Sequence, residues 1–213
     1  MYETLKLATD DRGVATLTLA REEKHNAMSA QMIDELTQAA AALAADDAVR
    51  VVVLTGAGKS FCAGGDLGWM QAQRDMDGPT RSAEAGKLAT MLGIIPATIG
   101  PYVLARMGEG RARRVFMSAR LFDAAEAVDL GLLARAVPAD ELDGAIEAEV
   151  IPYLSCAPGA VAAAKQLARD LGPRIDAQVV EHTIAALADR WETEEAAEGI
   201  GAFFDKRKAA WVS

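Results

Sequence analysis

The sequence contains few of the residue types on which several classes of protein depend. Aromatic residues make up only 5% of its 213 residues, and it has two cysteines and two histidines. Cys62 and Cys156 lack the spacing of a disulfide framework or of a metal site, and the two histidines stand alone. We therefore expect reduced thiols, a cytoplasmic location and no bound metal.

Long apolar runs and an excess of positive charge are also missing. No stretch reaches the length of a membrane span, and Met1–Thr4 lacks the basic and apolar regions of a signal peptide, so we expect no membrane partner. Lys and Arg total 22 against 31 Asp and Glu, a net charge of -9, which argues against nucleic acid as a partner. With 51% hydrophobic and 25% charged residues, the chain has a globular composition and enough length for its own core.

The most informative stretch runs from Val49 to Met70. Its unbroken apolar run, Val51–Leu54, predicts a strand that is buried on both faces of an α/β sheet. Glycine-rich residues follow, and Ala63–Asp66 lead into the expected first turn of a short helix. Small residues at a helix N-terminus leave backbone N–H groups uncovered. Such groups bind an anion, or an oxygen that becomes negative during a reaction.

The spacing of these glycines allows three interpretations. Gly56–Ser60 is similar to the end of a phosphate-binding loop, but the glycine that the full motif requires five residues before Gly58 is replaced by Val53, within the strand. Nucleotide binding is therefore the weakest of the three. A tight strand-to-helix turn and an oxyanion hole fit the spacing equally well.

Hydrophobic periodicity and capping residues predict the other elements. Tyr2–Leu7 and Val14–Leu19 are expected to be strands, and Ser29 is expected to cap the helix that follows them. Leu132–Val137 is expected to be a returning strand. Further helices are expected over Thr80–Met91 and Tyr102–Met107, between Asp123 and Gly131, near Glu141, between Pro158 and Gly172, and after Thr193.

Four segments of the sequence resemble one known family. Phe61–Leu67, after a valine-rich strand and a Thr-Gly-x-Gly loop, resembles a motif of the enoyl-CoA hydratase/isomerase family, the crotonase superfamily. The other segments that resemble its signatures are Arg21–Met28, Phe122–Leu132 and Glu198–Lys208. The resemblance implies an α/β fold: a crotonase-like spiral of ββα units over residues 1–137, and a helical C-terminal part over residues 138–213 that forms a homotrimer or hexamer.

The resemblance also implies a chemistry. The substrate is an acyl-CoA thioester, coenzyme A is part of that substrate, and no cofactor is bound permanently. Negative charge develops on the thioester oxygen, where two backbone N–H groups stabilise it. The motif match makes the N–H of Gly65 one of these donors. The residues that the match assigns to CoA binding are Lys24, Ala27, Ala63, Gly65, Asp66, Leu67, Phe204 and Lys208.

The sequence departs from the family pattern in its middle. It has no Gly-Gly-Gly turn for the second donor and lacks the usual glutamates, and Met91 is followed directly by Leu92 and Gly93 where relatives have a long segment. Loss of central strands would expose the core, so we expect that residues are omitted from the sequence near 91–93 rather than deleted from the protein. Glu109 is the alternative candidate for the general base.

Two short segments, Ala97–Tyr102 and Gly68–Met70, resemble the family branch that acts on glutaconyl-type thioesters such as methylglutaconyl-CoA or isohexenylglutaconyl-CoA. The leading hypothesis is a hydro-lyase that hydrates a branched or glutaconyl-type 2-enoyl-CoA, or catalyses the reverse dehydration. Double-bond isomerisation, thioester hydrolysis and decarboxylation use the same oxyanion hole and stay open. If the gap near 91–93 is genuine, a non-catalytic CoA-binding subunit is a further alternative.

Overall fold

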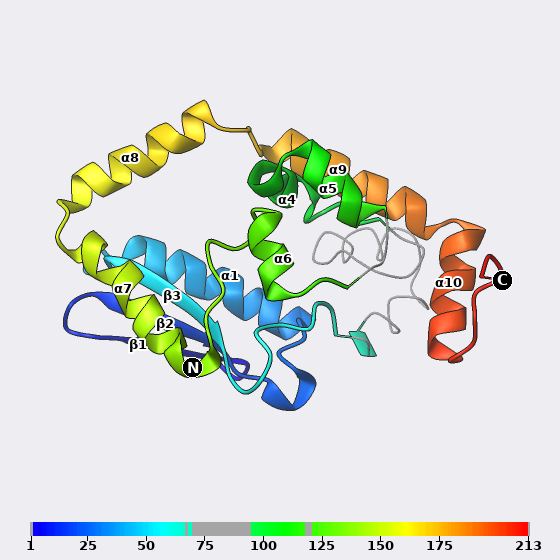
Figure 1. Ribbon diagram of the computed structural model, residues 1–213, viewed down its shortest axis with the longest axis horizontal. Helices are drawn as coiled ribbons and strands as arrows, with labels where there is room; N and C mark the ends of the chain where they lie inside the picture. Colours follow the sequence, from blue (N-terminus) through cyan, green and yellow to red (C-terminus); the bar gives the residue numbers. More distant parts are fainter. Residues whose placement is uncertain (1, 67, 70–94, 118–120, 213) are drawn as a thin grey trace. The chain divides into compact units, whose positions relative to one another are not determined.

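The computed structural model describes residues 2–66, 68–69, 95–117 and 121–212 (Figure 1). The chain forms two compact units: unit 1 comprises Met1–Met70 and Val137–Gly172, and unit 2 comprises Gln71–Ala136 and Pro173–Ser213. The division into residues 1–137 and 138–213 stays a prediction. The junction near 91–93 and the helix expected over Thr80–Met91 lie outside the described residues.

Unit 1 contains a three-stranded sheet in the order β1-β2-β3. β1 (Leu5–Thr9) pairs antiparallel with β2 (Val14–Leu19), and β2 pairs in parallel with β3 (Val51–Gly56). All three strands confirm predicted ones, although β1 begins later than expected. Gly13 makes the tight turn between the first two. Its φ is +79°, and a Cβ there would lie 2.3 Å from the carbonyl oxygen of Ala48.

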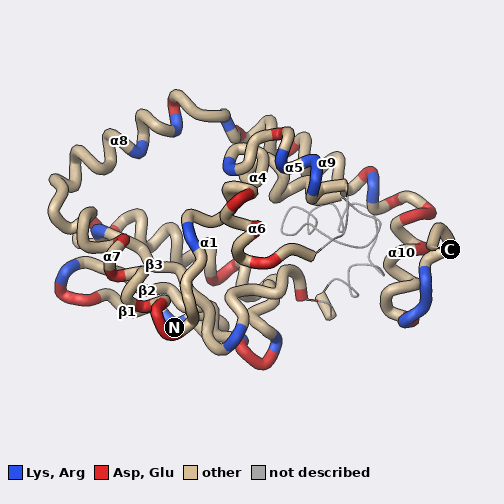
Figure 2. The backbone as a smooth tube through the Cα atoms, in the orientation of Figure 1, with Lys and Arg blue, Asp and Glu red and all other residues tan. Residues whose placement is uncertain are grey.

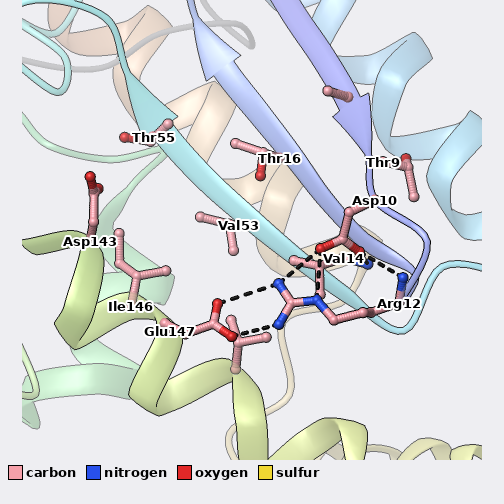
Figure 3. A pocket seen from close by; sticks show the side chains of 12 residues that line it. Thr9, Asp10, Arg12, Val14, Thr16, Val53, Thr55, Asp143, Ile146 and Glu147 are labelled. Carbon is pink, nitrogen blue, oxygen red and sulfur yellow. Dashed lines mark hydrogen bonds and ion pairs between the residues drawn. The ribbon is translucent and has the colours of Figure 1, made fainter.

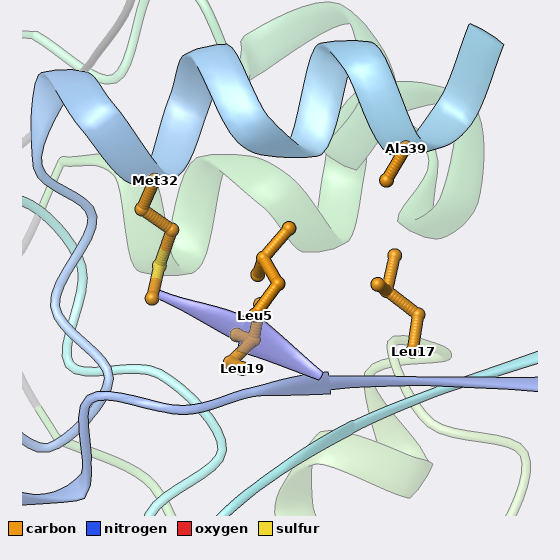
Figure 4. Packing of buried hydrophobic residues seen from close by; sticks show 5 residues of the cluster. All are labelled: Leu5, Leu17, Leu19, Met32 and Ala39. Carbon is orange, nitrogen blue, oxygen red and sulfur yellow. The ribbon is translucent and has the colours of Figure 1, made fainter. Parts of the chain in front are cut away.

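Helix α1 (Ala30–Ala45) connects β2 to β3 and covers one face of the sheet (Figure 4). The Ser29 hydroxyl accepts a hydrogen bond from the N–H of Met32, which confirms the predicted cap. The buried side chains between helix and sheet are Leu5, Leu17, Leu19, Met32 and Ala39. Each large apolar side chain that is fully buried contributes about 1.5–3 kcal/mol to folding, so this layer anchors the start of α1.

The apolar run of β3 is not buried on both faces, contrary to the prediction. Val52 and Leu54 are 47% and 49% exposed, although their partners in β2, Ala15 and Leu17, are buried. Within the described part of the chain, β3 is one of the two edge strands of the sheet. A side chain on an edge strand has a neighbouring strand on one side only, so an apolar sequence is not enough to bury it.

The returning strand predicted over Leu132–Val137 is wrong. This segment is an irregular connection, followed by a short 3-10 helix, η2 (Ala139–Glu141), and by α7 (Leu142–Leu154). None of the strands that the structure describes pairs with it. An apolar segment forms a strand only where a neighbour satisfies its backbone groups. Leu132 packs instead against a buried helical cluster.

Helix α7 packs against β3 on the face of the sheet opposite α1 (Figure 3). Arg12, in the turn between β1 and β2, lies 2.8 Å from Asp10 and 2.5 Å from Glu147 of α7. Its hydrogen bond lowers the pKa of Glu147 below the ordinary value. All three side chains are partly exposed, so they orient α7 more than they stabilise it. A cavity of about 360 Å³ lies beside them.

The remaining helices agree largely with the predictions. In unit 1, α8 (Pro158–Leu171) begins at its proline and ends at Gly172. The helices described in unit 2 are α4 (Gly100–Met107), α5 (Glu109–Phe116), α6 (Ala124–Asp129), α9 (Ala177–Trp191) and α10 (Glu194–Phe204). Asp123 and Thr193 cap α6 and α10 as predicted. Over the described residues, every helix is too short or too polar to cross a membrane.

Two buried clusters of described residues lie between helices of unit 2. The first contains Met107, Ala112 and Leu130, from α4, α5 and the end of α6. The second contains Leu187, Trp191 and Ile200, from α9 and α10. Short amphipathic helices are marginal alone, so these clusters provide the tertiary packing that stabilises them.

Glu35 is a buried carboxylate whose role could not be predicted from the sequence. It lies on α1 with 8% exposure and accepts hydrogen bonds from the N–H of Glu3 (3.0 Å), the N–H of Thr4 (2.9 Å) and the Thr4 hydroxyl (2.6 Å). Burial raises the pKa of Glu35, but the hydrogen bonds outweigh it and lower the pKa from 4.5 to about 2. The carboxylate therefore ties the segment before β1 to α1.

We expect the replacement Glu35→Gln to lower the free energy of unfolding by about 1–3 kcal/mol, because the new amide group would face a backbone donor. The folded-state pKa lies below the ordinary one, so this contribution is complete above pH 4.5 and is lost as the pH falls toward 2. Urea unfolding at neutral pH and at about pH 3 should show a smaller difference between variant and wild type at the lower pH.

Glu23 provides the control, since its carboxylate is exposed. Glu23→Gln should leave the unfolding free energy within about 0.5 kcal/mol of the wild type. Equal effects of the two replacements would contradict the role given to Glu35.

Candidate functional site

Two segments of unit 1, His25–Met28 and Ala63–Asp66, are joined by main-chain hydrogen bonds; we call them the paired loops. The N–H of Ala63 donates to the carbonyl of His25 at 3.0 Å. The N–H of Met28 donates to the carbonyl of Gly64 at 2.8 Å, and the carbonyl of Met28 accepts from the N–H of Asp66 at 3.0 Å. The N–H of Gly65 lies between these bonds and has no acceptor among the residues that the structure describes.

The peptide between Gly64 and Gly65 directs this N–H away from the partner loop. The peptide is trans, so its C=O and N–H point in opposite directions. The Gly64 carbonyl faces the N–H of Met28, and the Gly65 N–H therefore faces the other way. An unpaired backbone N–H held in a fixed direction is what an oxyanion hole requires. Gly64 has a φ of +89°, which glycine adopts more readily than other residues.

An ion pair fixes the end of the second loop. Nη2 of Arg21 lies 2.9 Å from Oδ2 of Asp66, and both side chains are 18% exposed. The other carboxylate oxygen accepts hydrogen bonds from the N–H groups of Gly68 and Trp69, so Asp66 caps the helical turn there. Burial raises the pKa of Asp66, but the hydrogen bonds from Arg21 and the backbone outweigh it and keep the pKa below its ordinary value.

Asn26 connects the paired loops to the loop after β3. Its side chain is fully buried, and its Nδ2 donates to the carbonyl oxygens of Ala57 (2.8 Å) and Ser60 (2.7 Å). Its Oδ1 accepts from the N–H of Arg21 at 2.9 Å. The role of Asn26 could not be predicted from the sequence. The sequence shows only an asparagine in a polar loop. Asparagine favours the left-handed backbone conformation found here, with a φ of 55°, but its hydrogen-bond partners cannot be read from the sequence.

The predicted CoA-binding residues of unit 1 have different environments. Ala27 is buried, Ala63 is exposed, and Lys24 is exposed in the 3-10 helix η1 (Glu22–Lys24). Ala27 and Ala63 lie on the two paired loops, and CoA binding by these residues stays a prediction. The carboxylate of Asp66 is already engaged by Arg21. Leu67 lies outside the described residues.

Glu109, the candidate base, begins α5 in unit 2. Its side chain is 76% exposed and lies 3.4 Å from Arg113, one helical turn later. This is the setting of a surface residue on a helix, and catalysis by Glu109 stays a prediction. No group of three or more His, Cys, Asp and Glu side chains within the described residues could hold a metal ion.

The two remaining candidates, Phe204 and Lys208, lie at the end of unit 2. Phe204 closes α10 and packs against the cluster that contains Trp191. Lys208 is exposed in the basic stretch after α10 (Figure 2). In the same stretch, Arg207 makes two hydrogen bonds to Glu198, at 2.7 and 2.8 Å, and lowers the pKa of that carboxyl to about 2. CoA binding by Phe204 and Lys208 stays a prediction.

Comparison with known proteins identifies similar chains. A family model described as "Enoyl-CoA hydratase/isomerase" matches residues 9–86 and 79–213. The chain is 30% identical over 259 residues to the "Probable enoyl-CoA hydratase" of Rhizobium meliloti, with 98% of this chain and 97% of the relative covered.

Solved structures give the same result for the fold. The crystal structure of an enoyl-CoA hydratase from Shewanella pealeana is 28% identical with a TM-score of 0.75, covering 99% of this chain and 97% of that one. Pseudomonas aeruginosa AtuE is 31% identical with a TM-score of 0.68, covering 99% of this chain and all of that one. The fold is therefore the crotonase fold, as predicted.

These alignments also concern the gap expected in the sequence. The alignment with the Rhizobium meliloti protein extends over 259 residues, whereas this chain has 213, so the relative contains residues that have no counterpart here. The family model matches two segments of the chain, and these overlap at residues 79–86. The overlap lies near the expected junction at 91–93, and both the overlap and the junction lie outside the described residues. Whether those residues are omitted or deleted stays a hypothesis.

We expect Asn26→Asp to lower the free energy of unfolding by about 1–3 kcal/mol, because a carboxylate would replace the donor that two carbonyl oxygens share. Urea unfolding measures the change. Gln38→Glu is a matched control, since it makes the same chemical change at an exposed position of α1. Equal unfolding midpoints for Asn26→Asp and wild type would contradict the role of Asn26 between the loops.

Proposed function

Because the chain belongs to the enoyl-CoA hydratase/isomerase family, we propose that it is a hydro-lyase that adds water to a 2-enoyl-CoA thioester or removes it. The unpaired N–H of Gly65 carries this proposal. During the reaction the thioester oxygen becomes negative, and the Gly65 N–H donates to it more strongly than to the ground-state carbonyl. One such donor contributes about 3–4 kcal/mol to lowering the barrier. Coenzyme A enters as part of the substrate, and no permanent cofactor takes part.

The acyl group in this proposal is branched or glutaconyl-like. The support is the resemblance of Ala97–Tyr102 to the branch of the family that acts on such thioesters. In unit 2 this segment leads into α4, with Pro101 in its first turn and Ala97 packed against the cluster of α9 and α10.

The reaction also requires a group that transfers the proton. Asp66 follows Gly65, but its carboxylate is paired with Arg21 and its pKa is low, so it is a poor proton acceptor. Glu109 is an alternative base, although its side chain is exposed beside Arg113. The same oxyanion donor supports isomerisation, thioester hydrolysis or decarboxylation when acids and bases are placed differently.

A second candidate function is non-catalytic CoA binding. It is favoured by one specific observation: the sequence lacks the glutamates that family members use, and relatives contain residues with no counterpart here. In both candidates we propose a homotrimer or hexamer in the cytoplasm, without nucleic-acid or membrane partners. Light scattering measures the assembly.

An assay with crotonyl-CoA and methylglutaconyl-CoA separates the candidates through loss of the enoyl absorbance. Turnover of methylglutaconyl-CoA in preference to crotonyl-CoA is expected. Preference for crotonyl-CoA would contradict the proposed acyl group. CoA binding without turnover of either thioester would contradict the hydro-lyase and favour the non-catalytic candidate.

Gly65→Pro tests the donor itself, since proline has no N–H. We expect kcat to fall about a hundredfold to a thousandfold, with an unfolding midpoint close to that of the wild type. Gly65→Ala is the matched control, because alanine keeps the N–H, and it should retain kcat within about threefold. Activity of Gly65→Pro equal to that of Gly65→Ala would remove the main support for the proposal.

A further inference from the structure

Cys62 lies at the start of the loop that carries Gly65, and its thiol is hydrogen-bonded within that loop. The N–H of Gly64 donates to Sγ of Cys62 at 3.3 Å. The side chain is partly buried and packs against the cluster between α1 and the sheet, which includes Leu5 and Met32. The Cys62 side chain therefore contacts the hydrophobic core, and its sulfur also accepts a hydrogen bond from the loop.

This bond acts on a glycine, a residue type with more backbone freedom than the others. Gly64 joins two peptide groups, and rotation about its φ and ψ changes the direction of the Gly65 N–H. Met28 holds one of these peptides through the Gly64 carbonyl. Cys62 holds the other through the Gly64 N–H. With both peptides held, the two dihedral angles of Gly64 are fixed.

We propose that Cys62 is a positioning residue: its Sγ accepts the Gly64 N–H and thereby keeps the Gly65 N–H directed toward the substrate oxygen. Its effect passes entirely through Gly64. The inference rests on the proposed function, since it gives the Gly65 N–H the role of an oxyanion donor. A thiol is a weak acceptor, so this bond contributes little to the free energy of unfolding, and its role is to orient the peptide groups of Gly64.

Two replacements of similar size distinguish the loss of the hydrogen-bond acceptor from the loss of packing by the Cys62 side chain. Cys62→Ser keeps an acceptor, and Cys62→Ala removes it. In the hydration assay we expect Cys62→Ala to lower kcat about tenfold to a hundredfold, as small misplacements of catalytic groups do, with KM within about twofold. Cys62→Ser should restore most of kcat. Equal kcat in wild type and Cys62→Ala would overturn the proposal, and so would equal losses in both variants.

Hydrogen exchange of the Gly64 amide provides a readout that does not depend on turnover. Exchange should be slow in wild type and Cys62→Ser and at least several-fold faster in Cys62→Ala, because only the alanine lacks an acceptor. If wild-type protein turns over no thioester, the proposed function fails, and exchange alone then tests the positioning. Equal exchange in all three proteins would overturn it.

Discussion

The hydrogen bond from the N–H of Met28 to the carbonyl of Gly64 is the constraint on which the site depends. It joins two loops that are far apart in the sequence, and it sets the direction of the next N–H, that of Gly65. Met28 itself has little freedom. The following residue, Ser29, caps α1, and α1 is packed on the sheet through Met32 and its neighbours. The direction of one backbone N–H is therefore determined by the core of unit 1.

The other contacts of the site hold the same two loops in place. Asn26 fixes the first loop to the loop after β3, and Arg21 fixes the second loop through Asp66. These polar groups are largely or fully buried and hydrogen-bonded to defined partners. A buried polar group is costly without its partners, so each contact favours a single arrangement of the loops. Catalysis by fixed dipoles requires a single arrangement of the loops, because the N–H then does not have to be reoriented during the reaction.

The sequence predicted the features that depend on neighbouring residues. Ser29, Asp123 and Thr193 cap helices because each accepts a hydrogen bond from an N–H three residues later. The resemblance of Phe61–Leu67 to a family motif identified the Gly65 loop. Contacts between distant residues could not be predicted. Glu35 binds Thr4 across 31 residues, and Asn26 binds Ser60 across 34.

Two predictions were wrong for a related reason: the burial of β3 on both faces and the strand over Leu132–Val137. The run from Val51 correctly indicated a strand, but its burial depends on a neighbour that the described chain does not place beside β3. Leu132–Val137 has a strand-like composition and no strand to pair with among the described residues. Composition records how well a residue suits a sheet, whereas burial and pairing depend on the rest of the sheet. The half-exposed Val52 and Leu54 lie on the strand that leads directly to the Gly65 loop. An edge strand pairs with a neighbour on one side only, so the direction of the Gly65 N–H depends mainly on two hydrogen bonds of Gly64. Its carbonyl accepts from the N–H of Met28, and its N–H donates to Sγ of Cys62.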